Sequence, residues 1–502
     1  MTFEIVFVLL SLLGMMAALI ADKMRPGMVL FSVVVLFLCV GILTPKEMLE
    51  GFSNKGMITV ALLFLVSEGI RQSGTLGQVI KKLLPQGKTT VFKAQLRILP
   101  SVAFISAFLN NTPVVVIFAP IIKHWAKSVK LPATKFLIPL SYVTILGGIC
   151  TLIGTSTNLV VHGMILEAGY EGFTMFELGK VGIFIAIAGI IYLFIFSKRL
   201  LPDARPDTAV PDEEVEEGEK LHRVEAVLGA RFPGINKKLS DFNFQRHYGA
   251  EVKEIKTRNG QRYVDHLEDV VLREGDTLVV MADDTFIPTW GESSVFVLLT
   301  NGNDPDTSGK KKRWLALILL VLMIVGATVG ELPATKEMFP DIKLDMFFFV
   351  CITTIIMAWT NIFPARKYTK YISWDILITI ACAFAISKAM VNSGVADCVA
   401  GFIIGLSDDY GPHVLLAILF VITNLFTELI TNNAAAALAF PLALSISAQL
   451  GVSPTPFFVV ICMAASASFS TPIGYQTNLI VQGIGNYKFT DFVRIGLPLN
   501  II

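Results

Sequence analysis

Long apolar runs separated by short polar segments make up most of the chain. Clear examples lie at residues 3–20, 28–43, 181–196, 314–329 and 346–359. Several of these runs approach or exceed the roughly 17–20 residues that an α-helix needs to cross the hydrocarbon core of a bilayer. The pattern therefore predicts a polytopic α-helical membrane protein.

The apolar pattern is interrupted once. Between residues 201 and 312 the chain is charged and resembles a soluble domain, and apolar segments resume at Trp314. We expect three parts: a first membrane region at 1–200, an insert at 201–312 and a second membrane region at 313–502. Composition agrees with a membrane protein, because 16% of the 502 residues are charged, against about 25% in soluble domains.

The two membrane regions resemble each other in sequence. The segment SEGIRQSG (67–74) matches SKAMVNSG (387–394), and IGTSTNLVVHG (153–163) matches IGYQTNLIVQG (473–483). Both pairs are separated by 320 residues (387 − 67 and 473 − 153). A constant separation over about a hundred residues predicts an internal duplication, as in transporters built from inverted repeats.

Each region is predicted to contain three spans, one re-entrant hairpin and two further spans. A re-entrant hairpin does not cross the membrane, so five crossings per region make the second region inverted relative to the first. The expected spans lie at 3–20, 28–43, 58–70, 137–162, 180–197, 314–331, 346–361, 374–390, 457–482 and from 490 onward, and the expected hairpins at 95–127 and 412–447.

The distribution of basic residues supports this inversion. Lysine and arginine are frequent around the first hairpin and beside the insert, but none occurs between Lys388 and Lys488, around the second hairpin. Because cytoplasmic loops are enriched in these residues, we expect a cytoplasmic insert in a multi-pass protein of the plasma (inner) membrane. The last span is shorter than its counterpart, so we expect the natural chain to continue beyond residue 502.

Uncharged polar residues lie at the tips of both predicted hairpins. The tips read Asn110-Asn111-Thr112-Pro113 and Thr431-Asn432-Asn433. Polar side chains are costly in hydrocarbon, and irregular backbone persists there only where it is buried in protein or lines a wet cavity. Since helix N-termini favour anions and carbonyl ends favour cations, such a tip can hold both kinds of ion.

Each region also contains a polar break within an apolar span. The breaks are GTSTN at Gly154–Asn158 and GYQTN at Gly474–Asn478. A hydroxyl side chain, Ser106 or Thr427, precedes each tip asparagine by five residues. Four polar clusters at duplicated positions are better explained by a substrate and ion site than by hydrogen bonds between helices alone.

The tips and breaks resemble those of the divalent anion–sodium symporters, whose hairpins carry Ser-Asn-Thr and face a Gly-Thr-Pro-Pro-Asn-like break. This resemblance covers both membrane regions. It implies a homodimeric secondary transporter in which the part that carries the hairpins moves like an elevator. It assigns anion binding to Asn110, Asn111, Thr112, Ser156, Thr157, Asn158, Thr431, Asn432, Asn433, Gln476, Thr477 and Asn478. It assigns sodium binding to Ser106, Asn110, Asn111, Gly154, Thr427, Asn432 and Gly474.

The sequence departs from the family pattern in a way that bears on the substrate. Asn110 and Thr431 replace serine, and the Pro-Pro pair becomes Ser156-Thr157 and Gln476-Thr477. More hydrogen-bond donors around a compact site suit a small, fully oxygenated anion. We therefore expect import of sulfate coupled to sodium. The alternatives are a sodium-coupled C4-dicarboxylate symporter and a proton-coupled or ungated anion carrier.

The insert carries its own pattern. Strand-like runs lie at 224–229, 250–256 and 277–281, and LREGDTLVVMAD resembles the C-terminal domain of potassium-conductance regulators. Such domains are small α/β folds that often dimerise and sometimes bind small ligands. The resemblance implies regulation by an unidentified small ligand; a dimer brace or an inert insert is the alternative.

Three other functions compete with a symporter: a passive channel regulated by the insert, an intramembrane enzyme, and an arsenite-efflux carrier. A channel would be expected to build a symmetric pore from parallel subunits, and no nucleophile–base pair, P-loop or metal cluster is visible in the sequence. We expect neither enzymatic activity nor, with a net charge of +1, nucleic-acid binding. Glu428, whose counterpart is Ala107, is either a coupling residue or a local hydrogen-bond partner.

Overall fold

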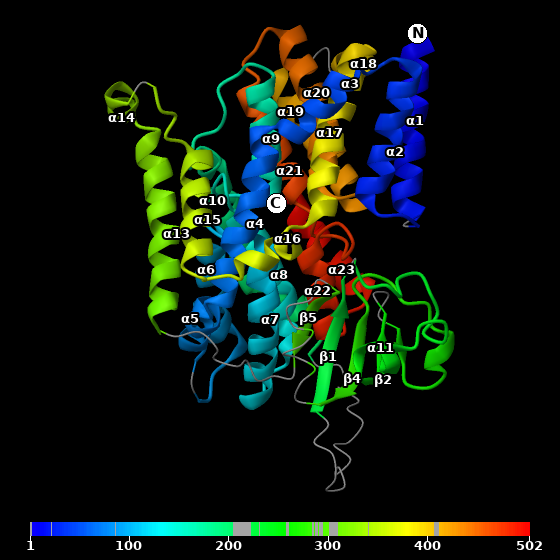
Figure 1. Cartoon of the computed structure of the whole chain (residues 1–502), viewed down its shortest axis with the longest axis vertical. Coiled ribbons are helices and arrows are strands. Elements are labelled where there is room, and N and C mark those ends of the chain that lie inside the picture. Colours follow the sequence, from blue (N-terminus) through cyan, green and yellow to red (C-terminus); the bar gives the residue numbers. More distant parts are fainter. Residues whose placement is uncertain are drawn as a thin grey trace, which may run out of the picture.

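The computed structural model describes residues 3–21, 23–85, 87–203, 222–229, 231–257, 261–283, 286, 290, 295–300, 310–339, 341–405 and 411–502 (Figure 1). Helices make up most of this part of the chain, and one small sheet lies at the lower end of the view. The helices share one apolar core, and the sheet has a second core of its own.

The first membrane region folds into helices whose ends follow local sequence signals. Gly41, with a φ of 84°, ends one helix in the left-handed conformation. The Thr44 hydroxyl accepts from the amide of Glu47 and caps the next helix. The helices are α1 (Phe3–Ala21), α2 (Pro26–Val40), α3 (Pro45–Glu50), α4 (Lys55–Gln72), α5 (Thr75–Leu83), α6 (Val91–Ser106), α7 (Asn111–Ser128), α8 (Leu137–Gly148), α9 (Ser156–Glu167) and α10 (Gly179–Leu200).

The second membrane region presents helices in a closely similar order. Helix starts keep the separation seen in the sequence, as in Thr75 and Val395, or Ser156 and Gln476. The helices are α13 (Lys310–Gly330), α14 (Pro333–Met338), α15 (Met346–Trp359), α16 (Tyr368–Tyr371), α17 (Trp374–Asn392), α18 (Val395–Gly405), α19 (Pro412–Leu429), α20 (Asn432–Leu450), α21 (Thr455–Ser466), α22 (Gln476–Gly485) and α23 (Phe489–Ile501).

Seven helices in the described part of the chain are long and apolar enough to cross a membrane. Two of them, α19 and α20, are the arms of the second predicted hairpin, so length alone does not separate a re-entrant arm from a span. The outer helices expose large apolar side chains, such as Phe184 on α10 and Trp314 on α13. Together these features identify a multi-pass membrane protein, because water would not stabilise such a surface.

The two spans with polar breaks are each divided into two short helices. Helix α8 ends at Gly148 and α9 begins at Ser156; α21 ends at Ser466 and α22 begins at Gln476. The predicted spans 137–162 and 457–482 are therefore interrupted at their predicted polar breaks, where glycine and polar residues cluster. This interruption leaves helix ends inside the apolar core, where their backbone groups need partners.

The insert forms a five-stranded antiparallel sheet in the order β3-β2-β4-β1-β5. Its core is rich in aromatic residues, among them Phe232, Tyr248 and Phe296. Three of the strands match the runs predicted from the sequence. The elements are β1 (His222–Leu228), α11 (Phe244–Tyr248), β2 (Glu251–Lys256), β3 (Arg262–Tyr263), β4 (Thr277–Ala282) and β5 (Phe296–Thr300).

The insert lies beside α7 and α22 of the membrane regions (Figure 1). Lys123 on α7 forms an ion pair at 3.0 Å with Glu225 on β1. On the other side, a Cβ at Gly275, just before β4, would lie 3.4 Å from Leu479 of α22. Helix α7 follows the first tip and α22 follows the second break, so the insert touches the elements that carry the candidate site.

Candidate anion and sodium site

Four helices begin at the predicted tips and breaks. Helices α7 and α20 start at Asn111 and Asn432, and α9 and α22 start at Ser156 and Gln476. None of their N-cap side chains accepts a hydrogen bond from the first turn. Uncapped helix N-termini present backbone N–H groups and a positive dipole end, which together favour an anion.

The first tip meets the second break. The side-chain amide of Asn111 lies 2.6 Å from the Tyr475 hydroxyl, and that hydroxyl lies 3.0 Å from Thr155 Oγ1. The Thr112 hydroxyl donates to Gln476 Oε1 at 3.3 Å. Asn111, Thr155 and Tyr475 are all buried. Residues separated by more than 300 positions therefore form one hydrogen-bonded cluster.

The second tip meets the first break in the corresponding way. The hydroxyls of Ser156 and Thr157 both donate to Asn433 Oδ1 at 3.2 Å. Asn432 Oδ1 accepts from the backbone amide of Asn433 at 3.0 Å. The Thr431 hydroxyl is buried and has no hydrogen-bond partner among the described residues, so it is open to a ligand.

Several oxygens gather around the Asn111 side chain. With Nδ2 turned toward them, it reaches Ser106 Oγ at 2.8 Å, Thr144 O at 3.0 Å and Gly154 O at 3.2 Å, while Oδ1 accepts from Tyr475. Ser106, Asn111 and Gly154, all predicted sodium ligands, thus lie together. Hydroxyl and carbonyl oxygens are the hard ligands that small cations prefer.

The equivalent hydroxyl in the second region makes a different contact. We expected Ser106 and Thr427 both to face their tips, and Ser106 does lie 2.8 Å from Asn111. Thr427 instead donates to Ala465 O at 2.6 Å. The reason is helix length, because α6 ends at Ser106 whereas α19 continues to Leu429 and keeps Thr427 within the helix.

Asn158 and Asn478 occupy equivalent positions that hold the breaks in shape. The Asn158 amide donates to Thr151 O at 2.9 Å and Gly148 O at 3.4 Å. Asn478 donates to Thr471 O at 3.1 Å and Ser468 O at 2.8 Å. Both asparagines are buried, and each satisfies two carbonyls that the break leaves without helical partners. Neighbouring Thr477 accepts from the Ser141 hydroxyl at 2.8 Å.

Glycine is required where each break folds back on itself. A Cβ at Gly154 would collide with the carbonyl oxygen of Gly148, and a Cβ at Gly148 would lie 2.6 Å from Asn111 Oδ1. In the second region a Cβ at Gly474 would collide with Ser468 Oγ. The predicted sodium positions Gly154 and Gly474 are thus places of close backbone approach.

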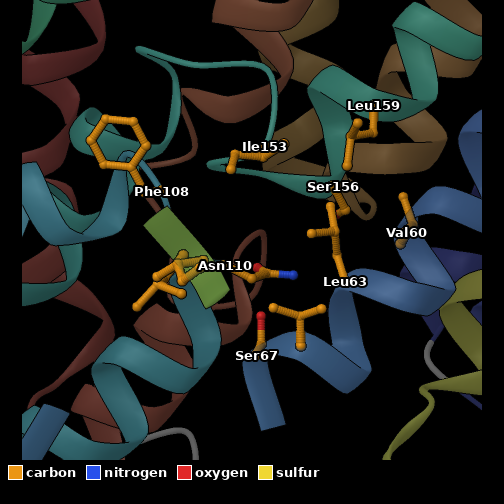
Figure 2. A pocket seen from close by; sticks show the side chains of 11 residues that line it. Val60, Leu63, Ser67, Phe108, Asn110, Ile153, Ser156 and Leu159 are labelled. Carbon is orange, nitrogen blue, oxygen red and sulfur yellow. The ribbon is translucent and has the colours of Figure 1, made fainter. Parts of the chain in front are cut away.

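A small pocket opens beside the first tip. Figure 2 shows the Asn110 side chain and the Ser67 hydroxyl directed into the same space, with Ser156 above them. The rest of the lining is apolar, including Phe108 and Leu159. Asn110 is half-buried. It occupies the N-cap position of α7, but its side chain accepts no hydrogen bond from the first turn of that helix.

Ser67 and Tyr475 belong to this site but were not among the predicted ligands. Ser67 belongs to the SEGIRQSG repeat, whose second copy carries Ser387, and both serines are buried. The repetition of this serine is the sequence signal that could have identified Ser67 as a site residue. Tyr475 gave no signal, because the first break has Thr155 at the equivalent position and a lone tyrosine in an apolar span is ordinarily a packing residue.

Comparison with known proteins agrees with this geometry. The citrate transporter family (CitMHS) matches residues 16–446 and, in an overlapping second match, 342–502. An uncharacterized transporter of Synechocystis is 29% identical over 94% of this chain and 90% of its own. A putative sulfur deprivation response regulator of Chlamydomonas reinhardtii is 28% identical over 94% of this chain and 95% of its own.

A further relative has a name that specifies its transported ions. The probable sodium/sulfate cotransporter 3 of Chlamydomonas reinhardtii is 32% identical over 56% of this chain, which is 31% of the cotransporter. The extensive family match and the polar tips and breaks lead to one assignment. The chain belongs to the citrate transporter family, within the divalent anion–sodium symporter superfamily.

Proposed function

We propose that this protein imports sulfate together with sodium. The observation that carries the proposal is the meeting of four uncapped helix N-termini through contacts between the regions, Asn111 with Tyr475 and Asn433 with Ser156 and Thr157. The tips and breaks contain no lysine or arginine. Backbone dipoles, amides and hydroxyls would therefore bind the anion, and co-transported cations would balance its charge.

The proposed anion contacts fall into two groups. Asn110, Thr112 and Gln476 are at least partly accessible, and the buried Thr431 hydroxyl has no partner among the described residues. These four would bind sulfate directly, together with the first-turn amides. Asn158 and Asn478 would act as positioning residues, because their amides already bind the carbonyls of the breaks. Sulfate offers four acceptor oxygens in a compact volume, which suits these donors better than an extended dicarboxylate or citrate does.

We propose a sodium site at the first tip and break. A sodium ion would bind beside Asn111, among Ser106 Oγ, Thr144 O and Gly154 O. Asn111 would then present Oδ1 to the ion, in the orientation in which Oδ1 accepts from Ser106, because an N–H group repels a cation. In the corresponding site near Asn432 and Gly474, Thr427 Oγ1 would offer its lone pairs to the ion while its hydrogen is donated to Ala465 O.

The finer architecture belongs to the same proposal. Helix pairs α6–α7 and α19–α20 would be re-entrant hairpins of two inverted repeats, which enter from opposite sides of the plasma membrane. The hairpins and broken helices would move as one body, like an elevator, within a homodimer. The insert would lie in the cytoplasm, because Lys123 and the other basic residues around the first hairpin belong on that side.

The direct test is ligand-dependent stability of the purified protein. We expect sulfate to raise the unfolding temperature in sodium chloride but not in choline chloride at equal ionic strength, with succinate and citrate less effective. Asn111→Ala should abolish the sulfate response. Stabilisation by succinate or citrate alone would contradict the proposed substrate, and an equal response in choline would contradict sodium coupling.

A further inference from the structure

Glu428 lies in a polar cluster at the C-terminal end of α19. Its Oε1 accepts from the Ser470 backbone amide and from Asn500 Nδ2, both at 2.8 Å, and its Oε2 accepts from the Ser468 hydroxyl at 3.4 Å. Asn500 Nδ2 also lies 2.8 Å from Ser470 Oγ. The cluster thus joins the arm of the second hairpin, the second break and α23.

The described residues of the first membrane region form no such cluster. At the repeat separation of 320 or 321 residues, Asn424, Glu428, Ser468 and Ser470 correspond to Ala103, Ala107, Gly148 and Cys150. Gly182 packs against Cys150 in the first break, and Gly496 packs against the equivalent Ser470 in the second break. The two glycines are therefore equivalent, and Asn500, four residues after Gly496, corresponds to Ala186. Five positions that carry small or weakly polar residues in the first repeat therefore carry polar residues in the second repeat. The cluster is present in the second repeat alone, whereas the tips and breaks occur in both.

The charge of Glu428 lacks a counter-ion among the described residues. The three donors to its carboxylate are neutral. Glu428 also lies in the last turn of α19, where the negative end of the helix dipole disfavours a carboxylate. An acidic side chain at membrane depth is expensive and ordinarily belongs to an ion pathway. A bound cation would supply the missing counter-charge and would offset the unfavourable helix dipole.

A second observation indicates the same ligand. Asn500 Oδ1 is buried and accepts no hydrogen bond from the described residues, although the nitrogen of the same amide contacts Glu428 and Ser470. Asn424 Oδ1 lies 3.5 Å from that nitrogen. Carboxylate, amide and hydroxyl oxygens together form a ligand set that suits a hard cation.

We propose that Glu428, Ser468 and Ser470 form an additional sodium site, which Asn500 completes when its amide turns and directs the unpartnered Oδ1 at the ion. This inference rests on the proposed sodium coupling and deepens it, since the site has no counterpart in the first repeat. The second repeat would bind one more sodium ion than the tip-and-break design provides. That ion would travel with the hairpin arm and would add one positive charge to each transport cycle.

The experiment uses the full chain in detergent, titrated with sodium chloride against choline chloride without sulfate. We expect Glu428→Gln, which keeps the size of the side chain, to raise the sodium concentration at half-maximal stabilisation about tenfold or more, because it removes the only full charge of the site. In proteoliposomes the Hill coefficient for sodium should fall by about one. Asn500→Ala should shift the sodium midpoint in the same direction.

Glu331→Gln is the matched control. Glu331 is also a half-buried carboxylate that accepts from a backbone amide, that of Met175 at 2.9 Å, so its replacement should leave the sodium response unchanged. A folded Glu428→Gln protein with the wild-type sodium midpoint and Hill coefficient would overturn the site. A Glu428→Gln protein that loses proton-driven uptake alone would also overturn the sodium site. If sodium does not stabilise the wild-type protein, the result contradicts the proposed sodium coupling as well as the additional site.

Discussion

At the scale of single residues, the site is built from neutral polar side chains that cross between the two membrane regions. The Tyr475 hydroxyl contacts Asn111 at 2.6 Å and Thr155 at 3.0 Å, and it also interacts with Asn432. One phenol therefore connects both tips with the first break. Removal of this hydroxyl would leave each buried partner without its hydrogen bond, so the loss of one oxygen atom should weaken the whole site.

Tyr475→Phe should weaken anion transport without unfolding the protein. The change keeps the ring but leaves buried partners unpaired, which costs about 1–3 kcal/mol and should raise the KM for the anion by roughly 5- to 150-fold. Uptake kinetics in proteoliposomes measure this. The matched control is Tyr192→Phe, which loses one hydrogen bond of 2.9 Å to Ile495 O outside the site. Equal effects of the two variants on KM would contradict the assigned role.

At the scale of elements, the breaks depend on backbone approaching backbone. The carbonyl oxygen of Gly148 occupies the space that a Cβ at Gly154 would take, and Asn158 binds that carbonyl as well. The sequence indicated both breaks through their glycines and polar residues. It could not indicate which tip contacts which break, since that depends on how helices more than 300 residues apart pack.

Gly154→Ala should disturb the first break more than its single methyl group suggests. The methyl would have to displace the backbone at Gly148, so the sodium-dependent rise in unfolding temperature should be largely lost and stability should fall by about 1–3 kcal/mol. Gly14→Ala serves as control, because no atom lies within 4 Å of a Cβ there. An unchanged sodium response in Gly154→Ala would argue against a cation at this break.

Sequence patterns predicted elements better than contacts. The strand-like runs at 224–229, 250–256 and 277–281 became β1, β2 and β4, because short runs rich in apolar and β-branched residues favour strands. The long apolar spans became helices because a helix satisfies its backbone hydrogen bonds internally in apolar surroundings. The different contacts of Ser106 and Thr427 were not predictable, because they follow from where α6 and α19 end.

At the scale of the whole molecule, the insert is tied to the elements that carry the site. Glu225 on β1 lies 3.0 Å from Lys123 of α7 and 3.4 Å from Lys256 of β2. Burial raises the pKa of Glu225, but the two lysines outweigh burial and hold the pKa at about 2. We propose that this ionic link lets the insert follow or restrain the movement of α7.

The link should be insensitive to pH over the physiological range. A depressed pKa means that the link stabilises the folded form above the ordinary value of 4.5 and that its contribution is lost as the pH falls toward 2. Hydrogen exchange of β1 and α7 should therefore be protected equally at pH 5 and pH 8, once corrected for intrinsic rates. Glu225→Gln should reduce protection at both pH values. Selective loss of protection at pH 5 in wild type would contradict the assigned ion pair.

The central claim is that the two tips and two breaks form one sodium-coupled site for sulfate. Uptake of labelled sulfate into proteoliposomes, with and without an inward sodium gradient and with succinate or citrate as competitor, tests it most directly. The account predicts uptake that requires the sodium gradient, resists both competitors, and is lost in Asn111→Ala and Asn432→Ala. Sodium-independent uptake, or uptake that succinate or citrate suppresses at equal concentration, would contradict it.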